Sequence, residues 1–354
     1  MALERKDATM SEKRSNTRIR RILIPALIFL SVFFVAGLLI AVGGNDPIKA
    51  YTVMIQGSLG SVEAITETVL KMVPIMLIGV AVCICFRAGF RNIGGEGQLQ
   101  MGALGATSLG LFFRNYDFSP WAVIPLVMIA GMVLGAVWAM IPAFISSKYG
   151  VNDILLTLLM NYVGINIVFY FVSFPLRNPA VTEFETLPLA PAALLPMLIP
   201  RTRFHAGIPV AFAIVILTYM ILWKTTLGFK FRSLGASPKA ARYAGIKPVR
   251  TIMYASIIGG ALPGIAGMME VSAVHMRLVN GFSPGYGFVG VASALLAGLD
   301  PKWTFLTSFM LSIVLIGTGT MQALANVPSA MAWIIQGLLV IFMLFARRQR
   351  IYGA

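Results

Sequence analysis

The feature that most constrains this sequence is a series of long apolar stretches that recur along nearly its whole length, separated by short polar segments. A transmembrane helix needs about 20 mostly apolar residues, and most of the stretches have this length. Only 12% of the 354 residues are charged, whereas soluble domains carry about 25%. The sequence therefore predicts an all-α, polytopic membrane protein with no appended soluble domain.

Ten stretches are candidate membrane spans: 22–43, 65–86, 93–113, 121–146, 154–175, 208–224, 252–271, 286–299, 303–323 and 329–346. The eighth has only 14 residues, which is short for a bilayer, so it could be a re-entrant segment, a broken helix or a loop. We expect a basic cytoplasmic arm over 1–21, one transmembrane domain over 22–346 and a cytoplasmic tail over 347–354.

The distribution of positive charge predicts the orientation of the chain. A net charge of +15 can indicate a nucleic-acid partner, but Lys and Arg are concentrated in the arm, the short loops and the tail, as the positive-inside rule requires. Ten crossings place both termini in the cytoplasm, together with 21 of the 28 basic residues. We therefore expect lipid, and no nucleic acid, around this chain.

Ten crossings divide into two sets of five, and an odd number per half gives the halves opposite orientations, as in an inverted repeat. The third member of each half is glycine-rich and either polar or short, at 92–107 and 285–298. Paired short or broken helices in corresponding positions indicate a transport pathway. The alternative is that the small residues serve close helix packing.

Several kinds of chemistry find no support in the sequence. It contains no G-x-x-x-x-G-K-[ST] loop, so any ATP must be bound and hydrolysed by another subunit. We expect no cofactor and no metal on this chain. Cys83 and Cys85 are interpreted as apolar filler, and His205 and His275 as solvated surface residues.

The segment from Lys224 to Arg250 carries seven basic residues and no acidic one. Within it, Ser237 is a candidate N-cap, Pro238 suits the first turn and Gly245 suits the end of a short helix. Two turns of helix are marginal in water, so the pattern favours a helix held against a partner. The alternative is an ordinary basic loop beside anionic lipid.

Three blocks give the sequence a resemblance to a known group. GASPKAARYAGI at 235–246, FRAGFRNIGGEGQLQMGALGA at 86–106, and GYGFVGVASALLAG at 285–298 with the following Asp300-Pro301 occur in family order. They resemble blocks of ABC-importer permeases of the ribose, nucleoside and branched-chain amino acid group, over about 65–345. One departure is Arg91, which separates the phenylalanine and asparagine that are adjacent in the familiar motif.

This resemblance implies a membrane-spanning permease subunit in the inner membrane of a bacterium. The implied partners are a cytoplasmic ATPase, a second permease that is commonly a different homologue, and an external substrate-binding protein. It also implies that the ATPase contacts the short helix through Gly235, Ser237, Pro238, Ala240, Ala241, Arg242, Tyr243 and Gly245.

Within the group, NDILLTLLMNYVG at 152–164 is more similar to the nucleoside and simple-sugar branch than to the amino-acid branch. Its Asp153, Thr157 and Asn161 share one helix side. They could face a pathway for a polar solute or make interhelical hydrogen bonds, worth about 0.6 kcal/mol each. The residues predicted to line the pathway are Asn92, Glu96, Gln98, Thr157, Asn161 and Phe288.

Glu96 is the most pointed of these, because an ionisable group within a membrane segment is costly. It could contact the solute, or it could cap a broken helix or pair with Arg87 or Arg91. An ion-coupled secondary transporter is the alternative of another class, and it would need acidic residues along the path, for which only Glu96 and Asp153 are candidates. The external loop 177–206 could dock a partner.

Overall fold

The computed structural model describes residues 31–328, with 330, 331, 333–335, 337, 338 and 341. The predicted basic arm and tail, the start of the first predicted span and much of the last one lie outside these residues. The described chain is built of helices, joined by loops that carry isolated β-bridges. The predicted all-α class is confirmed.

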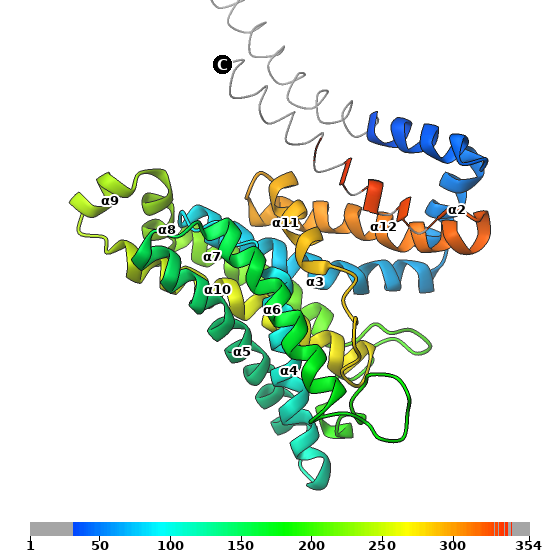
Figure 1. Ribbon diagram of the computed structural model, residues 1–354, viewed down its shortest axis with the longest axis horizontal. Coiled ribbons are helices and arrows are strands. Elements are labelled where there is room, and N and C mark those ends of the chain that lie inside the picture. The colour runs from blue at the N-terminus through cyan, green and yellow to red at the C-terminus, as the bar shows by residue number, and fades with distance from the viewer. Residues whose placement is uncertain (1–30, 329, 332, 336, 339–340, 342–354) are drawn as a thin grey trace, which may run out of the picture. The chain divides into compact units, whose positions relative to one another are not determined.

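The described residues divide into two compact units. The larger is Ser61–Ser312, and the smaller contains the described residues before Ser61 and from Ile313 onward. The larger unit contains the following helices (Figure 1): α3 Val62–Arg87, α4 Gly95–Phe112, α5 Pro120–Tyr149, α6 Asp153–Ser173, α7 Gly207–Lys224, α8 Thr226–Ala236, α9 Pro238–Tyr243, α10 Pro248–Met269, α11 Tyr286–Leu296 and the first half of α12 Pro301–Ala325.

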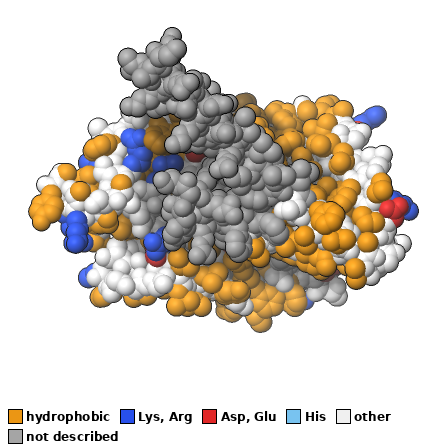
Figure 2. Space-filling view, turned by 90° about the horizontal axis from the view of Figure 1, so that it is seen from above, with side chains coloured by type: hydrophobic (Ala, Val, Ile, Leu, Met, Phe, Trp, Pro, Cys, Tyr) orange, Lys and Arg blue, Asp and Glu red, His pale blue; other side chains and the backbone are white. Residues whose placement is uncertain are grey.

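Six of the described helices are long and apolar enough to cross a membrane: α3, α5, α6, α7, α12, and α10 together with its π-helical continuation. A seventh span is obtained if Ser31–Val42 and α2 Pro47–Leu59, which are bent by 120°, count as one. Hydrophobic side chains cover large areas of the described surface in Figure 2. The chain is thus a polytopic membrane protein, as predicted.

Two predicted spans have particular lengths in the structure. The third is a continuous helix of 18 residues, α4. The eighth is α11, whose 11 residues give a length of about 16 Å, which is too short to cross a bilayer alone. The ten crossings and the inverted repeat stay predictions.

The centre of the larger unit is the contact between α4, α5 and α10. A Cβ atom on Gly264 of α10 would lie 2.3 Å from the Gly131 carbonyl oxygen of α5, and one on Gly102 of α4 would lie 2.3 Å from Gly264 Cα. Glycine lets helix backbones approach this closely. Small residues of α4 therefore serve close packing, which is the alternative that the sequence left open.

Sequence reasoning did not predict α2. The chain turns after Gly44, and Asp46 then caps the helix by accepting hydrogen bonds from the Ile48 and Lys49 backbone N–H groups at 2.9 and 3.4 Å. Pro47 occupies the first turn. This Asp-Pro pair is an ordinary start signal for a helix, and it was available in the sequence.

Candidate functional site

The short helix predicted in the basic segment is present as α9, which has six residues. Ser237 is its N-cap, and its Oγ accepts a hydrogen bond from the Ala240 N–H at 3.3 Å. Pro238 starts the first turn, and Gly245 follows the helix with a φ of +78°, which glycine adopts without strain. The cap, the proline and the glycine thus fix both ends of a helix that would be marginal in isolation.

Most of α9 is exposed. Ala241 is its buried residue, whereas the Tyr243 ring is 95% exposed and Arg242 and Lys239 also lie on the surface. Aromatic and arginine side chains are enriched where proteins bind partners. The helix therefore presents charged and aromatic side chains on an exposed surface, and its buried Ala241 faces the rest of the chain.

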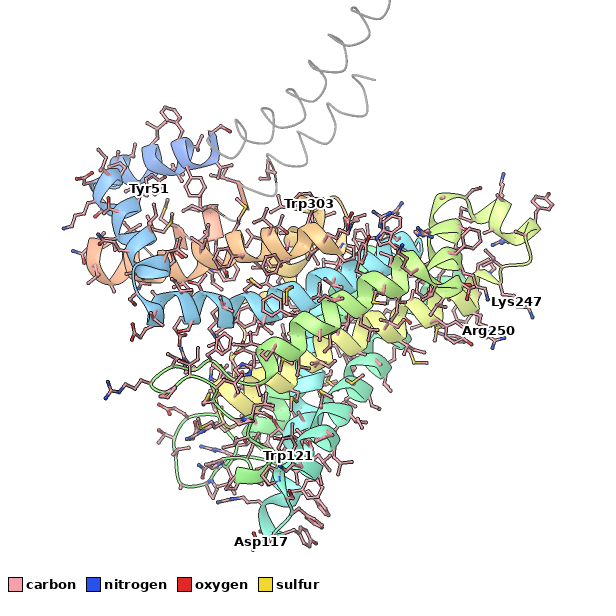
Figure 3. The ribbon with its side chains drawn as sticks, turned by 180° about the vertical axis from the view of Figure 1, so that it is seen from behind. Tyr51, Asp117, Trp121, Lys247, Arg250 and Trp303 are labelled. Carbon is pink, nitrogen blue, oxygen red and sulfur yellow. The ribbon has the colours of Figure 1, made fainter. Side chains whose placement is uncertain are left out.

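One groove includes residues of α9, and another begins at Gly245, just after the helix. The groove at Gly245, of about 330 Å³, is lined by Lys230, Lys247 and Arg250 among others, and the groove on α9, of about 320 Å³, by Pro238 and Arg242 among others. Lys247 and Arg250 lie together at the start of α10 (Figure 3). The basic side chains of these grooves suit a partner with acidic groups.

Gly235 holds the preceding helix in place. A Cβ at this position would lie 2.2 Å from the Arg87 carbonyl oxygen at the end of α3. The end of α8 is therefore packed directly on α3, which has the length of a membrane span. A displacement of the α8–α9 segment would be passed to α3 through this contact.

Four of the predicted pathway residues meet around the start of α4. The Thr157 Oγ1 accepts from the Ile93 N–H at 3.1 Å, and the Asn161 Oδ1 accepts from the Gly97 N–H at 2.8 Å. Asn161 also donates to the Ile93 carbonyl at 3.0 Å. These bonds from α6 satisfy backbone groups at a helix start, which otherwise lack partners.

Asn92 and Gln98 complete this network. Their side-chain amides bond to each other at 3.0 and 3.3 Å, and the Asn92 Oδ1 accepts from the Gly94 N–H at 2.8 Å. The four side chains thus orient α4 against α6. Phe288, on α11, is 37% exposed. Contact of these residues with a solute stays a prediction.

Glu96 caps a helix, but the helix is α11 and not its own. Its Oε2 accepts from the Gly287 N–H at 2.7 Å in the first turn of α11, where a carboxylate is favoured by the helix dipole. Gln100 lies 3.5 Å from its Oε1. The Arg87 side chain instead donates to the Leu299 carbonyl at 2.7 Å. The structural interpretation of Glu96 is the one that this geometry favours.

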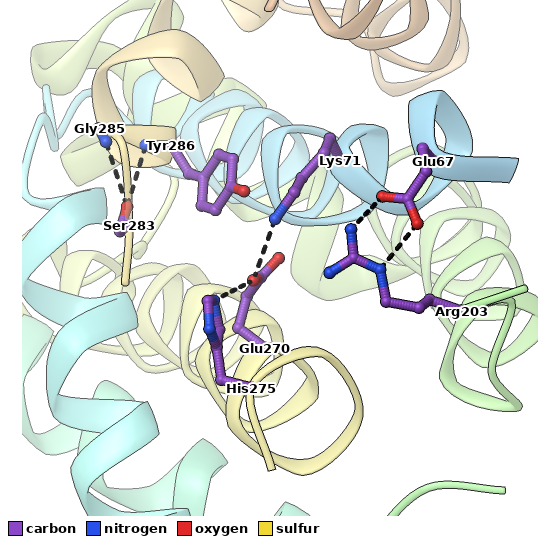
Figure 4. A network of polar contacts seen from close by, with 8 residues as sticks. All are labelled: Glu67, Lys71, Arg203, Glu270, His275, Ser283, Gly285 and Tyr286. Carbon is purple, nitrogen blue, oxygen red and sulfur yellow. Dashed lines mark hydrogen bonds and ion pairs between the residues drawn. The ribbon is translucent and has the colours of Figure 1, made fainter. Parts of the chain in front are cut away.

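A second group of polar residues was missed by sequence reasoning. We call Lys71, Glu270, His275 and Tyr286 the polar cluster (Figure 4). The Glu270 Oε2 lies 3.5 Å from Lys71 Nζ and 3.6 Å from His275 Nε2, and the Lys71 ammonium lies 5.3 Å from the centre of the Tyr286 ring. Glu270 and Tyr286 are 2% and 0% exposed. The available signal was the single charge that each of Lys71 and Glu270 places within an apolar stretch.

A π-helical turn places Glu270 in this cluster. The residues Glu270–Val274 continue α10 with wider turns, and the His275 N–H donates to the Glu270 carbonyl, five residues earlier, at 3.0 Å. Turns of this kind occur mostly as single bulges, frequently at functional sites. Sequence periodicity cannot locate such a bulge, because the apolar pattern continues on both sides.

Ion pairs hold the loop between α6 and α7 beside the cluster (Figure 4). Arg203 binds Glu67 of α3 with both ends of its guanidinium, at 2.7 Å for Nε and Oε1, and Glu185 pairs with Arg277. His205 in this loop is 1% exposed, so the expectation of a solvated histidine was wrong. Its Nδ1 accepts from the Gly207 N–H at 3.1 Å, and burial lowers the pKa of His205 to about 4. The imidazole is therefore neutral near pH 7.

Comparisons with known proteins agree on one class. Residues 64–344 match the family described as branched-chain amino acid transport system, permease component. The chain is similar to the glucose ABC transporter permease protein TsgB13 of Haloferax volcanii, with 33% identity over 92% of this chain and 89% of that protein. It is also similar to the guanosine ABC transporter permease protein NupP of Bacillus subtilis, with 29% identity over 92% and 93%. A second guanosine permease protein of that organism, NupQ, is 24% identical over 68% of this chain and 75% of its own length.

Proposed function

The chain belongs to the family of branched-chain amino acid transport system permease components, and we propose that it imports a nucleoside as the membrane-spanning subunit of an ATP-driven transporter. It is an ABC transporter permease, a multi-pass protein of the plasma membrane, and not itself an enzyme. ATP is hydrolysed by a separate ATPase subunit. This chain provides the pathway for the solute, and the ATPase moves its helices.

The substrate class rests on the relatives and on one helix. Proteins similar over nearly the whole chain are named for guanosine and for glucose, and the 152–164 segment of α6 resembles the nucleoside and simple-sugar branch. A nucleoside is the first candidate. A simple sugar is the second, favoured by the 33% identity to a glucose permease, and a branched-chain amino acid is the third, suggested by the family description. Family membership disfavours the ion-coupled alternative.

The partners follow from the same family. NupP and NupQ are two guanosine permease proteins of one organism, which supports pairing of this chain with a second, different permease. An external substrate-binding protein delivers the solute, and lipid surrounds the apolar helices. In this arrangement, in a bacterial inner membrane, the chain crosses about ten times, with both termini and α9 on the cytoplasmic side.

The observation that carries the mechanism is the exposed surface of α9. Its Tyr243 is 95% exposed on a helix whose ends are fixed, and Gly235 of the preceding helix contacts the end of α3. The ATPase grips α9, and the movement that follows nucleotide binding is passed to the membrane helices. The solute pathway then opens alternately to the two sides.

The test is uptake of radiolabelled guanosine, glucose and leucine in cells that lack this chain. The restored chain should rescue guanosine uptake, whereas Tyr243→Asp should abolish it at normal membrane abundance. Tyr116→Asp is the matched control. Tyr116 is also an exposed tyrosine, but it lies outside α9, just after the C-terminal end of α4. Rescue of glucose or leucine alone would reassign the substrate. Full uptake with Tyr243→Asp would refute the coupling role of α9.

A further inference from the structure

The polar cluster contains hydrogen-bonding capacity that the described protein does not use. The Glu270 Oε2, His275 Nε2 and Tyr286 Oη atoms are buried and form no hydrogen bond with any described residue. The ion-pair distances are 3.5 and 3.6 Å. A well-formed hydrogen bond between charged groups measures about 2.7–2.9 Å. The charged groups therefore lie near one another but do not form close hydrogen bonds with one another.

Such an arrangement is costly unless a ligand completes it. Buried polar atoms are nearly always hydrogen-bonded in native proteins, and ionisable groups within membrane segments mark solute pathways by default. Lys71 lies on α3 and Glu270 on the continuation of α10, and both helices have the length of membrane spans. The cluster is thus located within helices that are candidates to span the membrane.

The chemistry of the cluster selects one kind of solute group. Glu270 accepts hydrogen bonds, Lys71 donates them, and the Tyr286 hydroxyl and the His275 imidazole can interact with either kind of partner. A hydroxyl group both donates and accepts, so neighbouring hydroxyls on a ring can bond to the carboxylate and the ammonium together. A charged solute would instead be repelled by the one of the two side chains that has the same sign of charge.

We propose that the polar cluster binds the ring hydroxyls of the transported solute, through Glu270 and Lys71 with Tyr286 and His275 beside them. This assignment rests on the proposed function and deepens it, because ring hydroxyls are common to sugars and to the ribose of nucleosides. The cluster is prepared from two sides. The π-helical turn sets Glu270 and His275, and Glu96 fixes the start of α11 through the Gly287 N–H, next to Tyr286.

The test compares solutes with and without hydroxyls on the complete complex of both permeases and the ATPase in lipid nanodiscs. The external binding protein is omitted because it would discriminate by itself. Competition binding is measured with radiolabelled guanosine against guanosine and 2′,3′-dideoxyguanosine, and with radiolabelled glucose against glucose and 2-deoxyglucose. Loss of a hydrogen bond to a charged group should weaken binding of the deoxy compound to the unmodified complex roughly tenfold.

In Tyr286→Phe and Glu270→Gln this ratio should fall below roughly threefold. Tyr286→Phe removes one hydrogen-bonding partner, and Glu270→Gln replaces the charged acceptor by a neutral amide, whose hydrogen bonds are weaker. Glu67→Gln and Tyr170→Phe are the matched controls and should keep the unmodified ratio. Glu67, on α3, is like Glu270 a carboxylate in an ion pair, but its partner is Arg203. Tyr170 is a tyrosine outside the cluster, exposed on α6. If Glu270→Gln does not assemble, Tyr286→Phe decides, because it removes one oxygen atom only.

Uptake in cells by each variant separates this proposal from the proposed function. If the unmodified chain restores uptake of guanosine or glucose while the deoxy ratio is the same in all variants, the cluster is a structural ion pair and the hydroxyl assignment is wrong. If the unmodified chain restores uptake of neither, the proposed function fails and the assignment fails with it.

Discussion

Glu96 holds the first turn of α11 by accepting a hydrogen bond from the Gly287 N–H. Replacing it by methionine should leave the Gly287 N–H without an acceptor and destabilise the protein by about 1–3 kcal/mol. Glu96→Gln keeps an acceptor oxygen at the same place and should cost less. Thermal unfolding of the purified complex in detergent measures both. Equal unfolding temperatures for the two variants would show that the bond to α11 contributes nothing.

His205 should make the stability of the loop depend on pH. Burial lowers the pKa of His205 to about 4 in the folded protein, against about 6.5 in the unfolded chain. Between these values the unfolded form binds a proton that the folded form does not. Stability is therefore fully present above pH 6.5 and falls as the pH falls toward 4, by at most on the order of 3 kcal/mol.

The variant His205→Asn tests this dependence. Its Oδ1 can still accept from the Gly207 N–H, but it does not titrate. Unfolding temperatures of the complex, measured from pH 7 to pH 4.5, should fall less steeply for the variant than for the unmodified protein. Parallel curves would mean that other groups account for the pH dependence.

At the scale of elements, α9 depends on its cap. Ser237→Ala removes the oxygen that accepts from the Ala240 N–H, a loss worth about 1 kcal/mol. In a helix of six residues this should fray the first turn and lower guanosine uptake about fivefold at normal membrane abundance. Ser237→Thr keeps a capping oxygen and should restore most of the uptake. Wild-type uptake by Ser237→Ala would show that the ATPase itself holds the helix.

The elements also show what sequence could provide. The apolar stretches predicted the long helices, and Ser237, Pro238 and Gly245 predicted α9 between its true ends. The charges of Lys71 and Glu270 stand out in their apolar stretches, but their pairing could not be predicted, because the two residues are about 200 positions apart in the chain. The pairing also depends on a π-helical turn that leaves no mark on the apolar pattern.

At the scale of the whole molecule, one close contact between helices organises the larger unit. Gly264→Ala would bring a methyl group to 2.3 Å from the Gly131 carbonyl oxygen, a backbone atom that cannot move alone. The strain should cost more than the usual 1–3 kcal/mol of overpacking. We expect much lower membrane abundance, measured by immunoblotting. The control Gly319→Ala adds a methyl group with no described atom within 4 Å. Equal abundance of the two variants would contradict the close packing.

Sequence reached the class of the molecule but not the arrangement of its parts. Apolar stretches and charge placement predicted a polytopic membrane protein, and three short blocks indicated the permease family, which the match over 64–344 confirms. The packing of α4 on α5 and α10 was not predicted. The sequence shows that glycines stand at positions 102, 131 and 264 but not which of them pack together. The structure shows that Gly264 packs against both Gly102 and Gly131.

The π-helical turn after α10 has a mechanical consequence. A helix that holds one residue more than its regular ladder requires can shift that surplus along its length by exchanging a few backbone hydrogen bonds, without unwinding. Each such step turns the side chains it passes toward a different neighbour. The bond from the His275 N–H to the Glu270 carbonyl therefore marks the place where the end of α10 can change the direction in which its side chains face while it stays helical.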